Sequence, residues 1–161
     1  MAITRQKARY ARYADTKQWG LFEKIGHPNG RFSFLGTDGE PLVMGKALVF
    51  DSAASFASFF EKFFAGLETM HNISPGDFEP SDQSSDEVKA VFGFEDQLLS
   101  KALGSWVEIR GGGFYTETWK LIDGEWCIQE LSMRRTYQKM SLLAWVAVKV
   151  ATLFGITPTV R

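Results

Sequence analysis

The sequence is poor in cysteine and in net charge. Cys127 is the one cysteine among 161 residues, so no disulfide can form within the chain, and a zinc site built from cysteines is excluded. With 18 basic and 19 acidic side chains the formal net charge is −1. The chain therefore has neither the basic field that holds nucleic acid nor an acidic tail, and we expect no nucleic-acid partner.

The N-terminus lacks an apolar segment of signal-peptide length, because MAITRQKARY is interrupted by polar and basic residues. We therefore expect a cytoplasmic, reducing location. No linker or internal repeat marks a domain boundary. Apolar residues make up 45% of the chain and charged residues 23%, which is the composition of one globular domain with a real core.

The first part of the chain indicates helices. Residues 4–25 have the spacing of a helix, with Thr4 as its N-cap and Gly26 as its end. The segment HPNG, residues 27–30, is typical of a turn. A second helix is predicted to begin after Asp51 or Ser52 and to continue through a phenylalanine-rich segment.

From residue 68 onward the pattern indicates strands. Apolar and polar residues alternate over long runs, interrupted by PGD at 75–77, which predicts a turn. Asp123 and Gly124 form the tip of a predicted hairpin. In the strand before that hairpin, the triglycine at 111–113 indicates a bulge, or room for a close approach by a ligand. Helices followed by a mostly antiparallel sheet predict an α+β fold.

Asp15 is predicted to lie on the apolar side of the first helix. At 100° per residue, an arc of roughly 80° contains Ala8, Ala11, Asp15, Trp19 and Phe22. Burying an unpaired carboxylate costs several kcal/mol, so Asp15 requires a partner. Either it makes a structural hydrogen bond, to a strand or to Arg12, or it serves a site together with His71.

Three segments in order resemble the SnoaL-like group of the nuclear transport factor two-like superfamily: YARYADTKQW, TMHNIS and GGGFYTETWKLIDGEWCI. The pattern is most similar to the scytalone dehydratase-like and bile-acid dehydratase-like members. The resemblance implies a cone-shaped α+β barrel, in which a strongly bent sheet wraps on N-terminal helices around an apolar cavity. It implies a SnoaL-like domain at 1–137, with 138–161 as a C-terminal apolar helix packed on the domain or at an oligomer interface.

The resemblance also implies site residues. Asp15 corresponds to the catalytic aspartate of the helix, His71 to its histidine partner, and Tyr10 to the catalytic tyrosine of the bile-acid type. Arg134 corresponds to an arginine that holds an acidic substrate. The second histidine of the scytalone type is missing from RGGGFYTETW, where Tyr115 is available.

Aromatic residues are the other expected substrate contacts. These are Trp19, Tyr115, Phe56 and Phe60. The phenylalanines are core residues first, and helical spacing alone does not decide which of them line a cavity. For His71, a core histidine hydrogen-bonded to backbone remains the alternative to a catalytic role.

An Asp15–His71 pair inside an apolar cavity would be an acid/base device. The carboxylate fixes the tautomer of the imidazole, whose other nitrogen can remove a proton next to a carbonyl or deliver one to a leaving hydroxyl. A tyrosine can stabilise negative charge on the carbonyl oxygen.

We therefore predict a lyase or isomerase that needs no cofactor and no metal. It would act as a dehydratase, isomerase or cyclase on a hydrophobic oxygenated small molecule, such as a polyketide or terpenoid intermediate of secondary metabolism. The alternative is a non-catalytic small-molecule-binding or assembly protein of the same fold.

The C-terminal segment MSLLAWVAVKVATLFGI, residues 140–156, is apolar except for Lys149 near its middle. At about 17 residues with a central charge, it falls just short of a membrane span. It either closes the mouth of the cavity or packs in a homodimer, or it attaches peripherally to a membrane.

Overall fold

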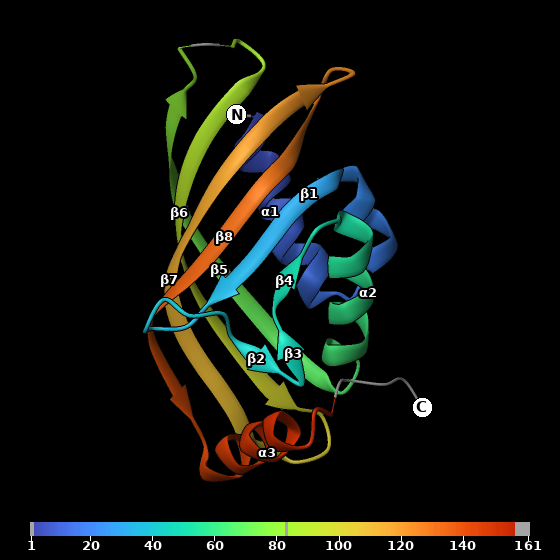
Figure 1. The fold of residues 1–161 in the computed structure, drawn as a ribbon, viewed down its shortest axis with the longest axis vertical. Helices are drawn as coiled ribbons and strands as arrows, with labels where there is room; N and C mark the ends of the chain where they lie inside the picture. Colours follow the sequence, from blue (N-terminus) through green and yellow to red (C-terminus); the bar gives the residue numbers. More distant parts are fainter. Residues whose placement is uncertain (1, 83, 157–161) are drawn as a thin grey trace.

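A computed structural model describes residues 2–82 and 84–156 (Figure 1). The helices of this part are α1 (Ala2–Asp15), the 3₁₀ helix η1 (Trp19–Lys24), α2 (Ala53–Phe64) and α3 (Leu142–Leu153). The strands are β1 (Gly26–Leu35), β2 (Val43–Met44), β3 (Lys46–Ala47), β4 (Val49–Phe50), β5 (Leu67–Pro80), β6 (Glu87–Ser100), β7 (Gly104–Ile122) and β8 (Glu125–Met140). The predicted α+β class is confirmed.

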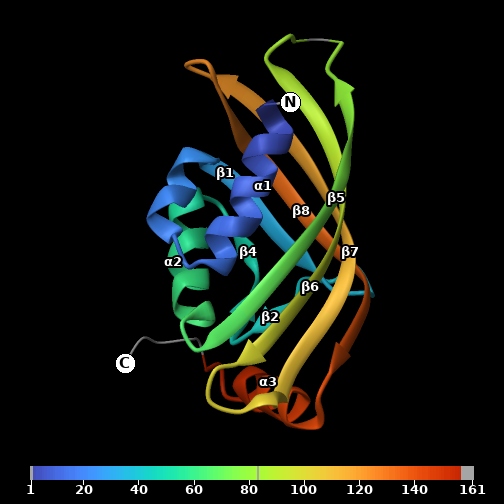
Figure 2. The ribbon, with the colours of Figure 1, turned by 180° about the vertical axis from the view of Figure 1, so that it is seen from behind.

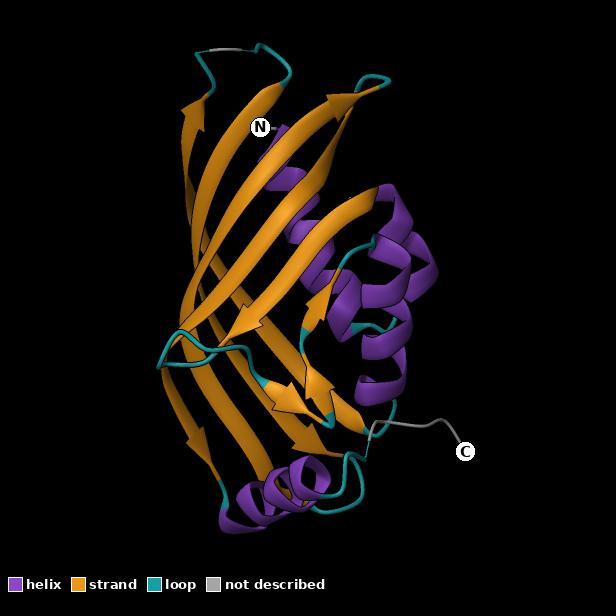
Figure 3. Ribbon diagram, viewed as in Figure 1, coloured by secondary structure: helices purple, strands orange, loops and turns teal. Residues whose placement is uncertain are grey.

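The main sheet is strongly curved and does not close on itself (Figure 3). It has six strands in the order β4-β1-β8-β7-β6-β5, so β4 and β5 are its edges. Neighbours are antiparallel except β1 and β8, which run parallel with Phe32 opposite Leu131. Seen from behind, α1 and α2 lie together on one side of this sheet, with α1 in front of β1 and β8 (Figure 2).

The first helix is shorter than predicted. Instead of continuing to residue 25, α1 stops at Asp15, Lys17 takes a left-handed φ of 60°, and η1 follows. That conformation is unfavourable for a side-chain-bearing residue and breaks the helix. Asp15 therefore stands at the end of α1. The buried side of α1 also differs from the predicted arc, since Lys7 is buried and Ala8 is exposed.

Two predicted turns are wrong, because the chain passes both sites as irregular strand. Residues 27–30 lie within β1, where the pairing with β8 shifts register between Gly26 and Arg31. Residues 75–77 lie within β5, which shifts against β6 between Ile73 and Gly76. Such bulges bend a strand without ending it, which suits a strongly curved sheet.

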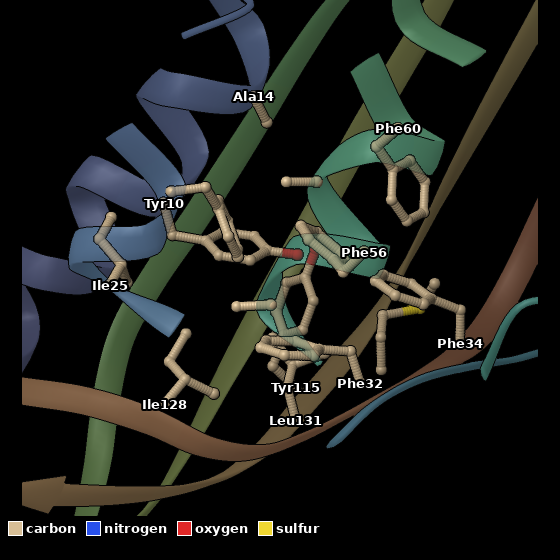
Figure 4. Packing of buried hydrophobic residues seen from close by; sticks show 14 of the residues in the cluster. Tyr10, Ala14, Ile25, Phe32, Phe34, Phe56, Phe60, Tyr115, Ile128 and Leu131 are labelled. Atoms are coloured by element: carbon tan, nitrogen blue, oxygen red, sulfur yellow. The ribbon is translucent and has the colours of Figure 1, made fainter. Parts of the chain in front are cut away.

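The core between the sheet and the helices is aromatic (Figure 4). Ser52 caps α2 by accepting a hydrogen bond from the Ser55 N–H, which fixes where the helix begins. From this helix Phe56 stacks on Phe34 at 5.7 Å between ring centroids. Each buried phenylalanine contributes about 1.5–3 kcal/mol, so α2 is held mainly by these rings.

Helix α3 lies at one end of the molecule, beside the ends of β6 and β7 (Figure 1). Its N-cap, Ser141, accepts hydrogen bonds from the N–H groups of Ala144 and Glu108 and donates 2.7 Å to the Trp106 carbonyl. Among residues 2–82 and 84–156, no helix is both long and apolar enough to cross a membrane. Residues 157–161 of the predicted C-terminal segment lie outside the described residues.

Candidate active site

A cavity of about 100 Å³ lies inside the curve of the sheet. Its wall is mainly apolar and aromatic and includes Phe34, Phe56 and Phe60 (Figure 4). The polar side chains of the wall are Tyr10, His71, Asp96, Tyr115, Arg135 and Gln138. A hydrophobic molecule with a few oxygen atoms is the ligand that such a lining suits.

Asp15 and His71 meet where the end of α1 packs on the edge strand β5. Asp15 Oδ1 lies 2.6 Å from His71 Nδ1, and Asp15 Oδ2 accepts a 3.0 Å hydrogen bond from the His71 backbone N–H. The Thr69 hydroxyl donates to Oδ1 at 3.0 Å. The side chain of Asp15 is 16% exposed and that of His71 is 8% exposed. Asp15 therefore makes both contacts that the sequence allowed for it, one to strand backbone and one to the imidazole of His71.

The ionisation state of Asp15 determines which ring nitrogen of a neutral His71 carries the hydrogen. Burial raises the pKa of Asp15, but the hydrogen bonds and charge of His71, with the Thr69 hydrogen bond, outweigh burial and hold that pKa below its usual value. The ionised carboxylate can only accept hydrogen bonds, so a neutral His71 carries its hydrogen on Nδ1. Nε2 is then unprotonated, on a ring that lines the cavity.

We expect Asp15→Asn to lower the free energy of unfolding at pH 7 by about 1–3 kcal/mol, because the amide replaces a charged acceptor of three hydrogen bonds. Since the folded-state pKa is depressed, the stabilisation by Asp15 is fully present above the unfolded-state pKa of about 3.9 and is lost as the pH falls through the folded-state value. Denaturant unfolding of both proteins at pH 7 and at steps below pH 4 should show the difference narrowing. An unchanged difference would contradict this account.

Tyr10 and Tyr115 face each other across the cavity wall (Figure 4). Their rings meet edge to face, with 5.8 Å between the ring centroids. Burial is the main cause that raises the pKa of both groups, so both phenols remain protonated. As protonated phenols in the cavity wall, they can donate a hydrogen bond to an oxygen of a bound molecule.

Trp19 also lines the cavity and carries a free donor. Its indole N–H is buried and has no hydrogen-bond partner among the described residues. Its ring stacks on Phe60 at 6.3 Å, so the indole is fixed in place. An unsatisfied buried donor costs about 1–3 kcal/mol, a cost that a ligand oxygen could remove.

Arg134 is not among the residues that line the cavity; its side chain is exposed. The next residue on β8, Arg135, points to the opposite face and does line it, because neighbouring residues of a strand alternate between faces. Arg135 makes a buried two-pronged ion pair with Asp96, at 2.9 Å from Nη1 to Oδ1 and 2.6 Å from Nη2 to Oδ2. The resemblance implied Arg134 as the arginine of the cavity. In the structure the next residue, Arg135, lines it instead.

Comparison with known proteins decides the family. A family profile described as "SnoaL-like domain" matches residues 1–132. The chain belongs to the SnoaL-like domain family. This SnoaL-like protein is 34% identical over 139 residues to a protein of Gibberella zeae named "Probable cyclase FGR4", which covers 86% of this chain and 91% of the relative.

Solved structures support the fold of this SnoaL-like protein. A putative scytalone dehydratase from Novosphingobium aromaticivorans superposes with a TM-score of 0.70 at 14% identity, covering 86% of this chain and 84% of that one. The hexachlorocyclohexane dehydrochlorinase LinA-type3 from Novosphingobium barchaimii gives 0.68 at 15% identity, covering 88% of each chain. At these identities the likeness concerns the fold alone.

The triglycine of the SnoaL-like domain makes room for the Arg135–Asp96 pair. Gly111 and Gly113 lie on β7, between the strands of Asp96 and Arg135. A Cβ on Gly111 would stand 2.0 Å from Arg135 Nη1. The predicted bulge is present, since the pairing of β7 with β8 shifts between Gly112 and Gly113. The space left open by the glycines is filled by the side chain of Arg135.

We expect Gly113→Ala to lower the free energy of unfolding by about 1–3 kcal/mol or more. A Cβ there would stand 2.0 Å from the Arg134 carbonyl oxygen, and backbone cannot rotate away as a side chain can. Gly66→Ala is the matched control, because nothing lies within 4 Å of its Cβ position. Thermal and denaturant unfolding measure both variants. Equal stabilities would show that the sheet relaxes around the added methyl group.

A second buried ion pair, not predicted from the sequence, lies behind the two tyrosines. The Lys7 ammonium pairs with Glu117 Oε1, and Trp119 Nε1 donates to Glu117 Oε2 at 2.9 Å. Lys7 Nζ also lies 3.4 Å from the ring centroid of Tyr115 and 4.2 Å from that of Tyr10. The ammonium therefore holds both cavity-lining rings from behind by cation–π contacts.

The remaining candidate groups lie outside the cavity lining. Neither His27 nor Cys127 is among its residues. Burial raises the pKa of the Cys127 thiol, with the Glu125 charge acting in the same direction, so the thiol stays protonated. In the described part of the SnoaL-like protein, no three His, Cys, Asp or Glu side chains are grouped so that they could hold a metal ion.

Proposed function

We propose that this chain is an acid/base enzyme, a lyase or isomerase, in which His71 moves the proton and Asp15 orients it. The observation that carries the proposal is the 2.6 Å contact of Asp15 Oδ1 with His71 Nδ1, on a histidine that lines an aromatic cavity. Buried, charge-coupled groups in a cavity are typical of catalytic sites.

The proposed step uses the nitrogen that Asp15 leaves free. His71 Nε2 takes a proton from a carbon next to a carbonyl, and the electron pair of the broken C–H bond moves toward the carbonyl oxygen. Asp15 stabilises the imidazolium that forms. In the next step the imidazolium returns the proton, either to another carbon or to a leaving hydroxyl, so His71 ends as it began and no cofactor is consumed.

The oxygen that gains charge would be held by the phenols. Tyr10 and Tyr115 keep their protons, which makes them donors rather than bases. Donors already fixed in place need no reorganisation as charge develops. The unpartnered indole N–H of Trp19 offers a second donor to an oxygenated substrate.

The reaction class follows from this step and from the relatives. Dehydration, double-bond isomerisation and cyclisation all begin with such a proton transfer. The relative named a probable cyclase and the structural neighbour named a putative scytalone dehydratase have names within this range. The aromatic wall favours a hydrophobic oxygenated substrate, for which a polyketide or terpenoid intermediate is our proposal.

Proton abstraction can be tested before the natural substrate is known. The purified protein is incubated in D₂O with a panel of hydrophobic ketones and β-hydroxyketones, and mass spectrometry follows deuterium uptake and loss of water. We expect at least one compound to exchange or to eliminate water much faster than in buffer. Tight binding of panel members without exchange, in wild type and variants alike, would instead support a non-catalytic binding protein of the same fold.

A further inference from the structure

Helix α3 packs on the domain through small residues and turns large apolar residues outward. Ala144 is buried, and Val148 and Ala151 are half-buried. The exposed apolar side chains of the helix are Leu142, Leu143, Trp145, Val146, Val150 and Leu153. Leu142 is 75% and Leu153 78% exposed. A helix that presents its largest apolar side chains to solvent marks an interaction surface.

The exposed apolar surface continues beside the helix. The turn between β6 and β7 lies next to α3 in both views (Figures 1 and 2). The turn carries Leu103, and Trp106, which is 73% exposed, follows in β7. Ser141 joins the start of α3 to the Trp106 carbonyl. Phe154 follows the helix and is also exposed. We call α3, this turn, Trp106 and Phe154 the apolar end of the molecule.

The charges of this end are basic. Residues 131–156 contain no acidic side chain. Lys149 lies within the exposed apolar side of α3, and Lys101 and Lys139 stand on the adjoining turn and strand. Lys149 Nζ lies 5.8 Å from the ring centroid of Trp145.

Acidic groups lie beside part of this charge, since Lys139 shares a groove with Glu95 and Asp96. Glu108, next to the N-cap of α3, is already paired with Arg110 at 3.2 Å. Asp38 and Glu40 belong to the loop before β2 and share a shallow groove with Leu142 at the flank of α3. Trp145 also lines this groove, whereas Lys149 does not.

We propose that the apolar end docks on an anionic lipid membrane, with α3 lying in the plane of the interface. The leucine, valine and phenylalanine side chains enter the acyl boundary, and Trp106 and Trp145 sit at headgroup level, where indoles are favoured. The stem of Lys149 stays apolar while its ammonium reaches the lipid phosphates. Lys101 and Lys139 add attraction to anionic headgroups.

A second copy of the chain fits this surface less well. In a two-fold interface centred on α3, a residue near one end of the helix would meet the other end of its partner, and residues near the middle, such as Lys149, would lie near their own counterparts. The two Lys149 ammonium groups would then approach each other, and α3 carries no carboxylate to compensate them. Lipid phosphates supply the negative charge that a copy of this helix lacks.

The docked orientation has a consequence that rests on the proposed function. Val148 of α3 and Met140, just before it, both line the cavity. The helix that contacts lipid therefore also forms part of the cavity wall. A hydrophobic substrate dissolved in the bilayer would reach His71 without first entering bulk water.

Flotation of the full chain with vesicles tests the docking without any substrate. Vesicles of phosphatidylcholine alone and of phosphatidylcholine mixed with phosphatidylserine are each combined with the protein at low and high salt. We expect most of the protein to float with the anionic vesicles at low salt, with weaker recovery at high salt and on neutral vesicles. Protein that stays out of both vesicle fractions would overturn the proposal, whatever the outcome of the deuterium experiment.

Two surface variants test whether vesicle binding comes from the apolar end or from exposed apolar residues in general. Leu142→Ser with Leu153→Ser should weaken recovery on anionic vesicles by at least about tenfold, because two apolar anchors are lost. Met70→Ser with Phe114→Ser removes comparable exposed apolar residues from the strands of the sheet and should leave recovery unchanged. Equal losses for the two variants would overturn the assignment. So would a wild-type dimer that the α3 variant dissociates while neither protein floats, since the face would then join two copies.

Discussion

Glu117→Gln and Lys7→Met, made singly, are each expected to lower the free energy of unfolding by about 3–5 kcal/mol. Both side chains are almost wholly buried, so either change leaves an uncompensated charge inside the domain. Burial lowers the pKa of Lys7 and raises that of Glu117, while their mutual attraction opposes both shifts. Removal of one partner removes that attraction and leaves only the cost of burial. Denaturant unfolding at neutral pH measures the loss.

The double variant tests whether the contributions of Lys7 and Glu117 to stability are coupled. Lys7→Met with Glu117→Gln removes both charges, fills a similar volume and keeps an oxygen that can accept from the Trp119 indole. Its loss should be clearly smaller than the sum of the single losses, giving a coupling energy in the range of about 0.5–3 kcal/mol or above. Additive losses would show that Lys7 and Glu117 are stabilised independently, contrary to the geometry.

His71→Ala is expected to lower the rate of deuterium exchange or elimination by about 10²–10⁴-fold, because it removes the group that takes the proton. The fold should persist, since the hydrogen bond to Asp15 Oδ2 comes from the backbone of residue 71 and is kept. The assay is the one described above, with a compound that the wild-type protein converts. Far-ultraviolet circular dichroism and a melting curve confirm folding.

Two further variants control the interpretation. His27→Ala replaces the second histidine of the chain, outside the cavity lining, and should leave the rate unchanged. Asp15→Asn keeps the shape but offers an amide that can donate to Nδ1, which would move the hydrogen of His71 to Nε2 and block the base. Its rate should fall with little change in substrate affinity. A His71→Ala protein of full activity would exclude the proposed mechanism.

Much of the fold followed from local patterns, and the errors have local causes. Strand alternation and the Asp123–Gly124 tip were predicted correctly, because period and turn chemistry are local signals. The end of α1 was predicted ten residues too late, since nothing in the sequence marks Lys17 as a left-handed residue. The contact of Asp15 with His71 was anticipated although the helical arc used for it was partly wrong.

The buried charges were missed because their partners are distant in sequence. Lys7 and Glu117 are 110 residues apart, and Asp96 and Arg135 are 39 apart. Strand alternation did carry a signal, since Glu117 shares a strand face with Tyr115 and Trp119. Asp96 likewise shares a face with Phe94 and Leu98. The same alternation along β8 predicts that Arg135, rather than Arg134, points toward the cavity.

The parallel pairing of β1 with β8 sets an order of events during synthesis. Phe32 cannot find its place opposite Leu131 until about 100 further residues have left the ribosome. Lys7 must likewise wait for Glu117. Until then the phenylalanine-rich α2 has only part of the sheet to cover it. Between the synthesis of Phe64 and that of Leu131, the nascent chain therefore exposes a phenylalanine-rich helix that is only partly covered, and such exposed apolar surface is what chaperones bind.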